Sequence, residues 1–343
     1  ENNTKYVALN TLLKVVDQEP AAVQRHRRFI SKCLRDPDIS IRKRALELSF
    51  AILDEGNLVE LVNELTAFLG KATDDDENLI VFTVENLVKV LDTYSVADEK
   101  WKLGVLFQSL KLVGTYLTSE IIGDILIAIN NAENSSQRRD LIVDMLRISL
   151  DSSKNFEISE ENSGWSIVAI WCIGEYADDL LETPVDRNLI SEFSLTKFLC
   201  TQEEKFNTND KKSLHYILTA SLKLSSKITD NGCIESLRQI ILNHTKDPDL
   251  MIQNKSVQYE IIFRQSKSVK KVLLDTMPKF EKRNPVEIEI GSSSKTARAN
   301  ITDTSSGLLD LGAENEKNHE STTKTPADLL ADLFSSTGIS GAG

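Results

Sequence analysis

Apolar residues recur at intervals of three and four positions along most of this chain, the spacing of one face of an α-helix. The first stretch with this pattern contains Tyr6, Leu9, Leu12, Leu13 and Val16. Similar stretches follow at residues 29–34, 41–53, 58–69, 79–91, 103–117, 121–129, 141–150, 165–176, 189–199, 214–224, 234–242 and 250–263. Short polar connections separate them, and no stretch alternates between apolar and polar positions as a half-buried strand does. The pattern predicts an all-α fold.

A turn motif occurs twice. Residues 33–41 (CLRDPDISI) are similar to residues 244–252 (HTKDPDLMI), and in each the second aspartate is predicted to cap the next helix. The two copies are 211 positions apart, or about five units of 42 residues, a period typical of HEAT and armadillo repeats. We therefore expect an α-solenoid of helix pairs. A compact bundle is the alternative, but it seldom accommodates so many helices of similar length.

The composition changes after Phe280. Residues 285–343 are rich in Ser, Thr, Gly, Asn and Glu, and Phe334 is their only aromatic residue. Such a segment buries too little apolar surface to offset the entropy of ordering it. We therefore predict a solenoid over residues 1–283 and a disordered tail over residues 284–343, and interpret Val286–Ile290 as the frayed exit of the solenoid.

Composition excludes several classes of protein. The 343 residues carry a net charge of −12, from 40 basic and 52 acidic side chains, which argues against a general nucleic-acid binder. No apolar run has the length of a membrane span, and no signal peptide is recognisable. The four cysteines lack metal-binding spacing and predict reduced, mostly buried thiols. Because the chain begins with Glu1 within a helical pattern, we expect a piece of a longer protein.

Motifs for catalysis are missing. The four histidines have no ligand spacing, and no nucleophile–base pair is apparent. The acidic run Asp74–Glu77 is interpreted as the negatively charged start of a helix rather than a cation site. The sequence predicts no metal, no cofactor and no enzymatic activity.

One basic cluster stands out. It consists of Arg25, His26, Arg27, Arg28, Arg35, Arg42, Lys43 and Arg44. One interpretation is a docking face for an acidic partner or an anionic membrane. The other, which we favour, is a solvated ridge in which some arginines pair with Asp36 or Asp38.

The tail contains three clusters of leucine and acidic residues. They are Leu308-Leu309-Asp310-Leu311, Asp328-Leu329-Leu330 and Asp332-Leu333-Phe334. Leucines occur by chance in disordered chains, and residues 326–334 are also compatible with a helical turn. Three such clusters in one tail favour peptides that place apolar side chains in a partner's groove.

The ordered part resembles the large-subunit trunk of the gamma-adaptin family. The strings that carry this resemblance are Lys5–Asn10, Val23–Arg27, Asp36–Arg42 with Arg44–Leu48, and Trp171–Tyr176. The resemblance implies an α-solenoid that assembles with beta-type, medium and small adaptor subunits. It also implies recruitment of the complex to membranes by an Arf-type GTPase, and a cytoplasmic protein peripheral to the trans-Golgi network, endosomes and clathrin-coated vesicles.

The same resemblance gives the tail a role. Leu308-Leu309-Asp310-Leu311 is similar to a clathrin-box peptide, although Gly312 stands where an acidic residue is usual. Asp328-Leu329-Leu330 is similar to a shorter clathrin-binding form, and Asp332-Leu333-Phe334 is a looser relative. The resemblance thus implies a non-enzymatic subunit of a clathrin adaptor complex that binds clathrin heavy chain through these residues. Other solenoid scaffolds, such as a nuclear transport receptor or a phosphatase scaffold, are the alternative, and an enzyme regulated by a helical array is a weaker one.

Overall fold

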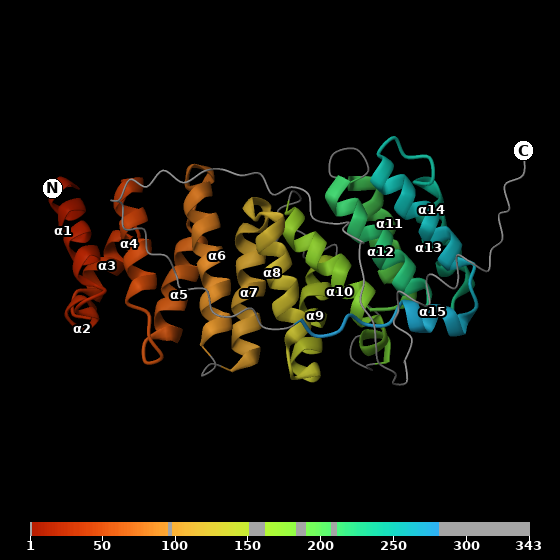
Figure 1. Cartoon of the computed structure of the whole chain (residues 1–343), viewed down its shortest axis with the longest axis horizontal. Helices are drawn as coiled ribbons and strands as arrows, with labels where there is room; N and C mark the ends of the chain where they lie inside the picture. Colours follow the sequence, from red (N-terminus) through yellow and green to blue (C-terminus); the bar gives the residue numbers. More distant parts are fainter. Residues whose placement is uncertain (1, 95–97, 151–161, 183–189, 207–210, 281–343) are drawn as a thin grey trace, which may run out of the picture. The chain divides into compact units, whose positions relative to one another are not determined.

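The structure is a computed structural model that describes residues 2–94, 98–150, 162–182, 190–206 and 211–280. Within these ranges all regular elements are helical, as the sequence predicts (Figure 1). The first half contains α1 (Asn2–Val15), α2 (Pro20–Gln24), α3 (Arg27–Cys33), α4 (Ile39–Ala51), α5 (Leu58–Leu69), α6 (Glu77–Thr93), α7 (Glu99–Val113) and α8 (Ser119–Asn131). The second contains α9 (Ser135–Leu150), α10 (Ser163–Glu182), α11 (Glu192–Phe206), α12 (Lys211–Ser225), α13 (Asn231–Asn243), α14 (Leu250–Phe263) and α15 (Lys267–Leu273). Two 3₁₀ turns, Asp74–Asp76 and Gly114–Tyr116, precede α6 and follow α7.

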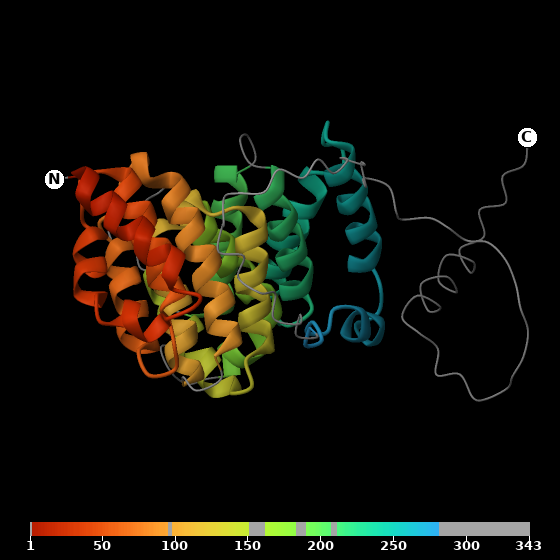
Figure 2. The ribbon, with the colours of Figure 1, turned by 60° about the vertical axis from the view of Figure 1, so that its left-hand side comes forward.

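The helices form two layers. From α4 to α14 each even-numbered helix packs on the next even-numbered helix, and from α5 to α13 each odd-numbered helix packs on the next odd-numbered one. Chain neighbours such as α5 and α6 pack across the layers, and Figures 1 and 2 show the pairs following one another in chain order. One continuous apolar core runs between the layers. This arrangement confirms the predicted α-solenoid and rules out the compact bundle.

The first Asp-Pro-Asp turn joins α3 to α4. Asp38 caps α4, since its carboxylate accepts a hydrogen bond from the amide of Ser40 at 2.9 Å. The buried Asp36 accepts from the Asp38 amide at 3.1 Å and forms an ion pair with Lys5 of α1 at 2.7 Å. The hydrogen bond from Lys5 lowers the pKa of Asp36. The turn thus caps α4 and, through the ion pair with Lys5, also links α1 to the connection between α3 and α4.

The second Asp-Pro-Asp turn repeats these contacts before α14. Asp249 accepts from the amide of Met251 at 2.8 Å, and Asp247 accepts from the amide of Asp249 at 2.9 Å. Lys211 of α12 takes the place of the earlier lysine, with its Nζ 3.3 Å from Asp247. In the described chain α14 lies ten helices, or five pairs, beyond α4. The two turns inferred to be related from sequence are therefore equivalent positions of a structural repeat, five helix pairs apart.

A buried histidine adds a contact that the first copy lacks. His244, with a side chain 2% exposed, lies between Glu203 of α11 and Asp247. Its Nε2 is 3.0 Å from Glu203 and its Nδ1 is 3.1 Å from Asp247. The hydrogen bond with Glu203 raises the pKa of His244 above 6.5, despite burial. The imidazole ring thereby joins α11 to the turn between α13 and α14.

The basic cluster is in part a paired ridge, but its partners differ from those expected. Arg27 lies 2.8 Å from Glu60 and 3.4 Å from Glu64 of α5. Arg42 forms an ion pair with Asp76 and donates to main-chain carbonyls of the first Asp-Pro-Asp turn. The predicted pairing of arginines with the aspartate side chains of that turn was wrong, because a lysine of α1 occupies one of them. Exposed members of the cluster are Arg25, His26, Arg28, Arg35 and Lys43.

Some expectations concern residues that the structure does not describe. Three of them lie outside the described residues: the boundary at residues 283/284, the segment Val286–Ile290 and the whole predicted tail. The described residues all belong to one compact unit. None of the described helices is long and apolar enough to cross a membrane. Among the described residues no group of His, Cys, Asp and Glu could hold a metal ion, and the four cysteines are unbridged.

Candidate functional site

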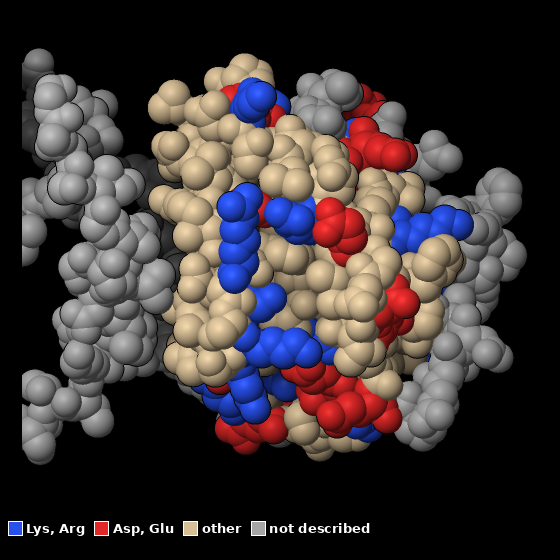
Figure 3. All heavy atoms as spheres, turned by 90° about the vertical axis from the view of Figure 1, so that its right-hand side faces the viewer, with Lys and Arg blue, Asp and Glu red and all other residues tan. Residues whose placement is uncertain are grey.

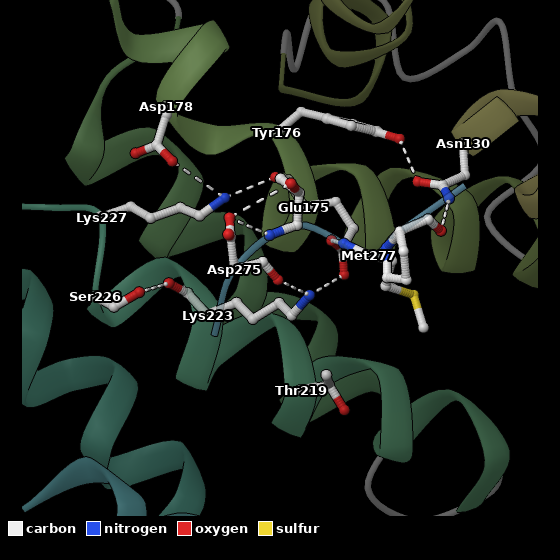
Figure 4. Close-up of polar contacts among 12 residues, drawn as sticks. Asn130, Glu175, Tyr176, Asp178, Thr219, Lys223, Ser226, Lys227, Asp275 and Met277 are labelled. Atoms are coloured by element: carbon white, nitrogen blue, oxygen red, sulfur yellow. Dashed lines mark hydrogen bonds and ion pairs between the residues drawn. The ribbon is translucent and has the colours of Figure 1, made fainter. Parts of the chain in front are cut away.

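The three predicted clathrin-binding peptides, Leu308–Leu311, Asp328–Leu330 and Asp332–Phe334, lie outside the described residues. The structure instead reveals the segment that leads toward them. After α15 the chain runs back past α12 and α10 to α8 (Figure 1). We call residues 275–280 the strap. The side chains that hold it form the cradle, which consists of Asn130, Asn131, Glu175 and Lys223. Figure 4 shows three of them, Asn130, Glu175 and Lys223, beside Asp275 and Met277 of the strap.

Glu175 is the centre of the cradle. Its side chain is 3% exposed, and its two oxygens serve different donors. Oε1 forms an ion pair with Lys223 of α12, and Oε2 accepts from the amide of Met277 in the strap at 3.0 Å. Lys223 also donates to the main-chain oxygen of Asp275 at 3.1 Å. A buried ion pair thus joins two helices of one layer and holds the start of the strap.

Two asparagines at the end of α8 hold the other half of the strap. Asn131 forms a two-way contact with Phe280: its Oδ1 accepts from the Phe280 amide at 2.8 Å, and its Nδ2 donates to the Phe280 carbonyl at 3.1 Å. Asn130 donates from Nδ2 to the carbonyl of Pro278 at 2.8 Å. A side-chain amide matches the donor and acceptor of a peptide unit, so it binds main chain irrespective of side-chain identity.

Tyr176 fixes the orientation of the Asn130 amide. Its buried hydroxyl donates to Asn130 Oδ1 at 3.1 Å, which turns the NH₂ group of that amide toward the strap (Figure 4). The guanidinium of Arg138 lies 4.3 Å above the tyrosine ring. Burial raises the pKa of the Tyr176 hydroxyl well above its ordinary value, so the hydroxyl remains a donor.

α10 is kinked where it builds the cradle. Tyr176 has φ −117° and ψ 19°, outside the helical region. Lys227, just beyond α12, donates to the carbonyl of Glu175 at 2.6 Å and lies 3.3 Å from Asp178. The lysine thus provides a hydrogen-bond partner to a carbonyl next to the kink.

Close packing of α10 against α12 sets the positions of both ion pairs. A Cβ atom on Gly174 would lie 2.9 Å from the Cα of Ala220, closer than such atoms approach. Only glycine permits this separation of the two helices. The short separation places Glu175 within reach of Lys223 on the facing helix.

The string Trp171–Tyr176, which carries part of the family resemblance, therefore contains Gly174, Glu175 and Tyr176 of this site. The apolar spacing over residues 165–176 predicted a helix, and Trp165, Cys172 and Tyr176 of that helix are buried. It missed the strap and the role of Glu175. A glutamate within an otherwise apolar helix was the available signal, because a buried carboxylate requires a partner.

The C-terminal end of the described helix stack is a mixed surface. Figure 3 faces this end, where lysine and arginine side chains lie among uncharged ones. Exposed apolar residues of α14 and α15 are Leu250, Met251, Val257, Ile261 and Val272. Burial lowers the pKa of Lys255 to about 8, and its Nζ donates to the carbonyl of His215 at 2.9 Å.

Paired helices in two layers with repeated capping turns define a HEAT- or armadillo-like α-solenoid, a class that presents stacked helices to binding partners. The family model of the adaptin N-terminal region matches residues 1–267, and the chain belongs to this family.

Its relatives are gamma subunits of AP-1 complexes. The chain is 51% identical over 339 residues to AP-1 complex subunit gamma-1 of Saccharomyces cerevisiae, which covers 97% of this chain and 40% of the relative. It is 31% identical over 290 residues to AP-1 complex subunit gamma of Dictyostelium discoideum, covering 82% of this chain and 31% of the relative. The chain therefore spans less than half the length of these relatives.

One solved-structure comparison supports the fold. The chain is similar to a chain in a homology model of the full-length AP-3 complex in an intermediate open conformation, with a TM-score of 0.56 and 19% identity. The match covers 80% of this chain and 51% of the other. At this identity the similarity concerns the solenoid architecture alone.

Proposed function

We propose that this chain is part of the gamma-type large subunit of an AP-1-type clathrin adaptor complex. The observation that carries the proposal is the adaptin match over residues 1–267 together with similarity to gamma subunits over nearly the whole chain. The solenoid acts as a non-enzymatic scaffold that packs against beta-type, medium and small subunits.

We also propose that the tail binds clathrin heavy chain. The binding residues are Leu308, Leu309, Asp310, Leu311, Asp328, Leu329, Leu330, Asp332, Leu333 and Phe334. Each cluster pairs apolar side chains with a carboxylate that fixes orientation in a groove. The yeast alignment continues past the end of the adaptin family match, which supports a shared role for this region.

The three clusters act together. Each alone binds weakly, because ordering a flexible peptide offsets much of the contact energy. The 20 residues between Leu308 and Asp328 span roughly 25 Å as a flexible coil, so two clusters of one tail can engage neighbouring sites. The second contact then gains from its high effective concentration.

In the cell, the complex would be recruited by an Arf-type GTPase to membranes of the trans-Golgi network and endosomes, and to clathrin-coated vesicles. This part of the proposal rests on membership in the adaptin family and on relatives named as AP-1 gamma subunits. The attachment proposed is peripheral, through the assembled complex.

Pull-down by the clathrin terminal domain tests the tail. Replacing Leu308, Leu309 and Leu311 by alanine should reduce capture of the full-length protein about tenfold or more, and adding alanines at the two later clusters should abolish it. The matched control replaces Ile301 and Ile339, apolar residues of the same tail outside the clusters. Undiminished capture after all three clusters are changed would refute the clathrin-binding role.

A further inference from the structure

The strap is bound through its main chain. In the part of the chain that the structure describes, five hydrogen bonds join it to the cradle, and each one ends on a backbone atom of the strap. They involve the carbonyls of residues 275, 278 and 280 and the amides of residues 277 and 280. The cradle side contributes four side chains from three successive helices of the even layer.

The strap is extended. Packed helices lie about 8–10 Å apart, so passing from α12 to α8 requires about 16–20 Å. Five to six residues cover this distance only when extended, at about 3.3 Å per residue. An extended chain exposes its amides and carbonyls, which are the groups that the cradle engages.

The side chains of the strap contribute little to its binding. All six residues of the strap are exposed, and the two largest apolar ones, Met277 and Phe280, are 43% and 42% exposed. Burial of apolar surface therefore does not hold the segment in place. The five hydrogen bonds to the strap gain an amount of free energy similar to the entropy lost in ordering its six residues. A segment held in this way opens locally without unfolding the helices beneath it.

We propose that Asn130, Asn131, Glu175 and Lys223 form a sequence-independent binding site for an extended peptide main chain, occupied in cis by the strap as a releasable latch. While the latch is closed, the last described residue, Phe280, is held at the end of α8. When the latch opens, α15 is the last element that is held, and the six released residues add about 20 Å of reach. The proposal goes beyond the adaptor function and stands whether or not the tail binds clathrin.

Proline and alanine variants separate main-chain recognition from side-chain recognition. Proline at position 280 removes the amide that donates to Asn131, whereas alanine keeps it. Hydrogen–deuterium exchange of the strap amides, measured on the full-length protein in the complex it forms, reports the closed state. We expect Phe280→Pro and Asn131→Ala to speed exchange of the Met277 amide about tenfold, the effect of losing one hydrogen bond or more. Phe280→Ala and Lys279→Ala should leave it unchanged.

Exchange within α10 and α12 shows that the solenoid remains folded in each variant. Strap amides that exchange at the rate of an unstructured peptide in the unaltered protein would overturn the proposal. So would a Phe280→Ala variant that opens the strap as much as Phe280→Pro, because side-chain contacts would then hold the segment. An Asn131→Ala variant with unchanged exchange would likewise remove the cradle's assigned role.

Discussion

Replacing Glu175 by glutamine tests the buried ion pair that joins α10, α12 and the strap. The two carboxylate oxygens accept from two donors, Lys223 Nζ and the Met277 amide. A glutamine side chain has only one acceptor oxygen, and its NH₂ group must then face a donor. The substitution keeps the shape of the side chain but leaves one donor without an acceptor.

The expected cost follows from burial. The side chains of Glu175 and Lys223 are 3% and 11% exposed, so solvent screens the pair little. Removing one partner of such a pair costs about 3–5 kcal/mol. Glutamine retains one of two hydrogen bonds, so we expect a loss of about 2–4 kcal/mol in the free energy of unfolding. Lys223→Met leaves the carboxylate without its cation and should cost about 3–5 kcal/mol.

A double-mutant cycle in urea-induced unfolding measures the coupling. In the Glu175→Gln/Lys223→Met protein neither charge of this ion pair remains, and the amide oxygen can accept from the Met277 amide. The double variant should therefore be more stable than the sum of the single losses by about 1–3 kcal/mol. Asp178→Asn is the control, because Asp178 is 58% exposed and Lys227 keeps its hydrogen bond to the Glu175 carbonyl, so the loss should be about 1 kcal/mol or less. Additivity of the two single variants within about 0.5 kcal/mol would refute the coupling.

Three further predictions concern helix packing, the buried histidine and a helix cap. Gly174→Ala should destabilise the protein by about 1–3 kcal/mol in chemical denaturation, because the added Cβ meets the Ala220 backbone. The control is Gly104→Ala in α7, which has open space around it and should stabilise the protein by about 0.5–1 kcal/mol. Equal effects of the two substitutions would contradict the close packing of α10 on α12. His244→Gln should lower the free energy of unfolding by about 1–3 kcal/mol below pH 6.5 and by less at higher pH. A histidine with a raised pKa stabilises the fold fully below its unfolded pKa and loses that contribution as the pH rises through its folded pKa. A destabilisation that grows with pH in urea unfolding would contradict the raised pKa. Asp249→Ala should lower the melting temperature through loss of about 1 kcal/mol of capping, while Asp249→Asn should restore most of it, and an equal loss in both would exclude capping.

The solenoid was predictable because its signals are local. Apolar spacing marked the long helices, and the Asp-Pro-Asp turns marked repeated caps five pairs apart. The short α15 was missed, since it has no buried residue and hence no clear apolar face.

The cradle was not predictable from sequence for a physical reason. Its partners are separated by about 50 to 150 positions, and the strap is bound by main-chain atoms that every residue possesses. Such binding imposes no pattern on the strap's own residues. Glu175 and the paired asparagines at the end of α8 were visible as polar residues in helical positions, but only the packing of α8, α10 and α12 shows what they hold.

The tail remains a matter of prediction. Its three leucine–acid clusters rest on composition and on the resemblance to adaptins, and the pull-down decides their role. The solenoid and the strap are independent of that result, because their contacts lie entirely within residues 2–280.

Affinity purification of the full-length protein, followed by identification of stoichiometric partners, tests the central claim most directly. The account predicts one beta-type large subunit, one medium subunit and one small subunit of an AP-1-type adaptor complex. Recovery of the protein with a nuclear transport GTPase or a phosphatase catalytic subunit, and without adaptor subunits, would contradict it.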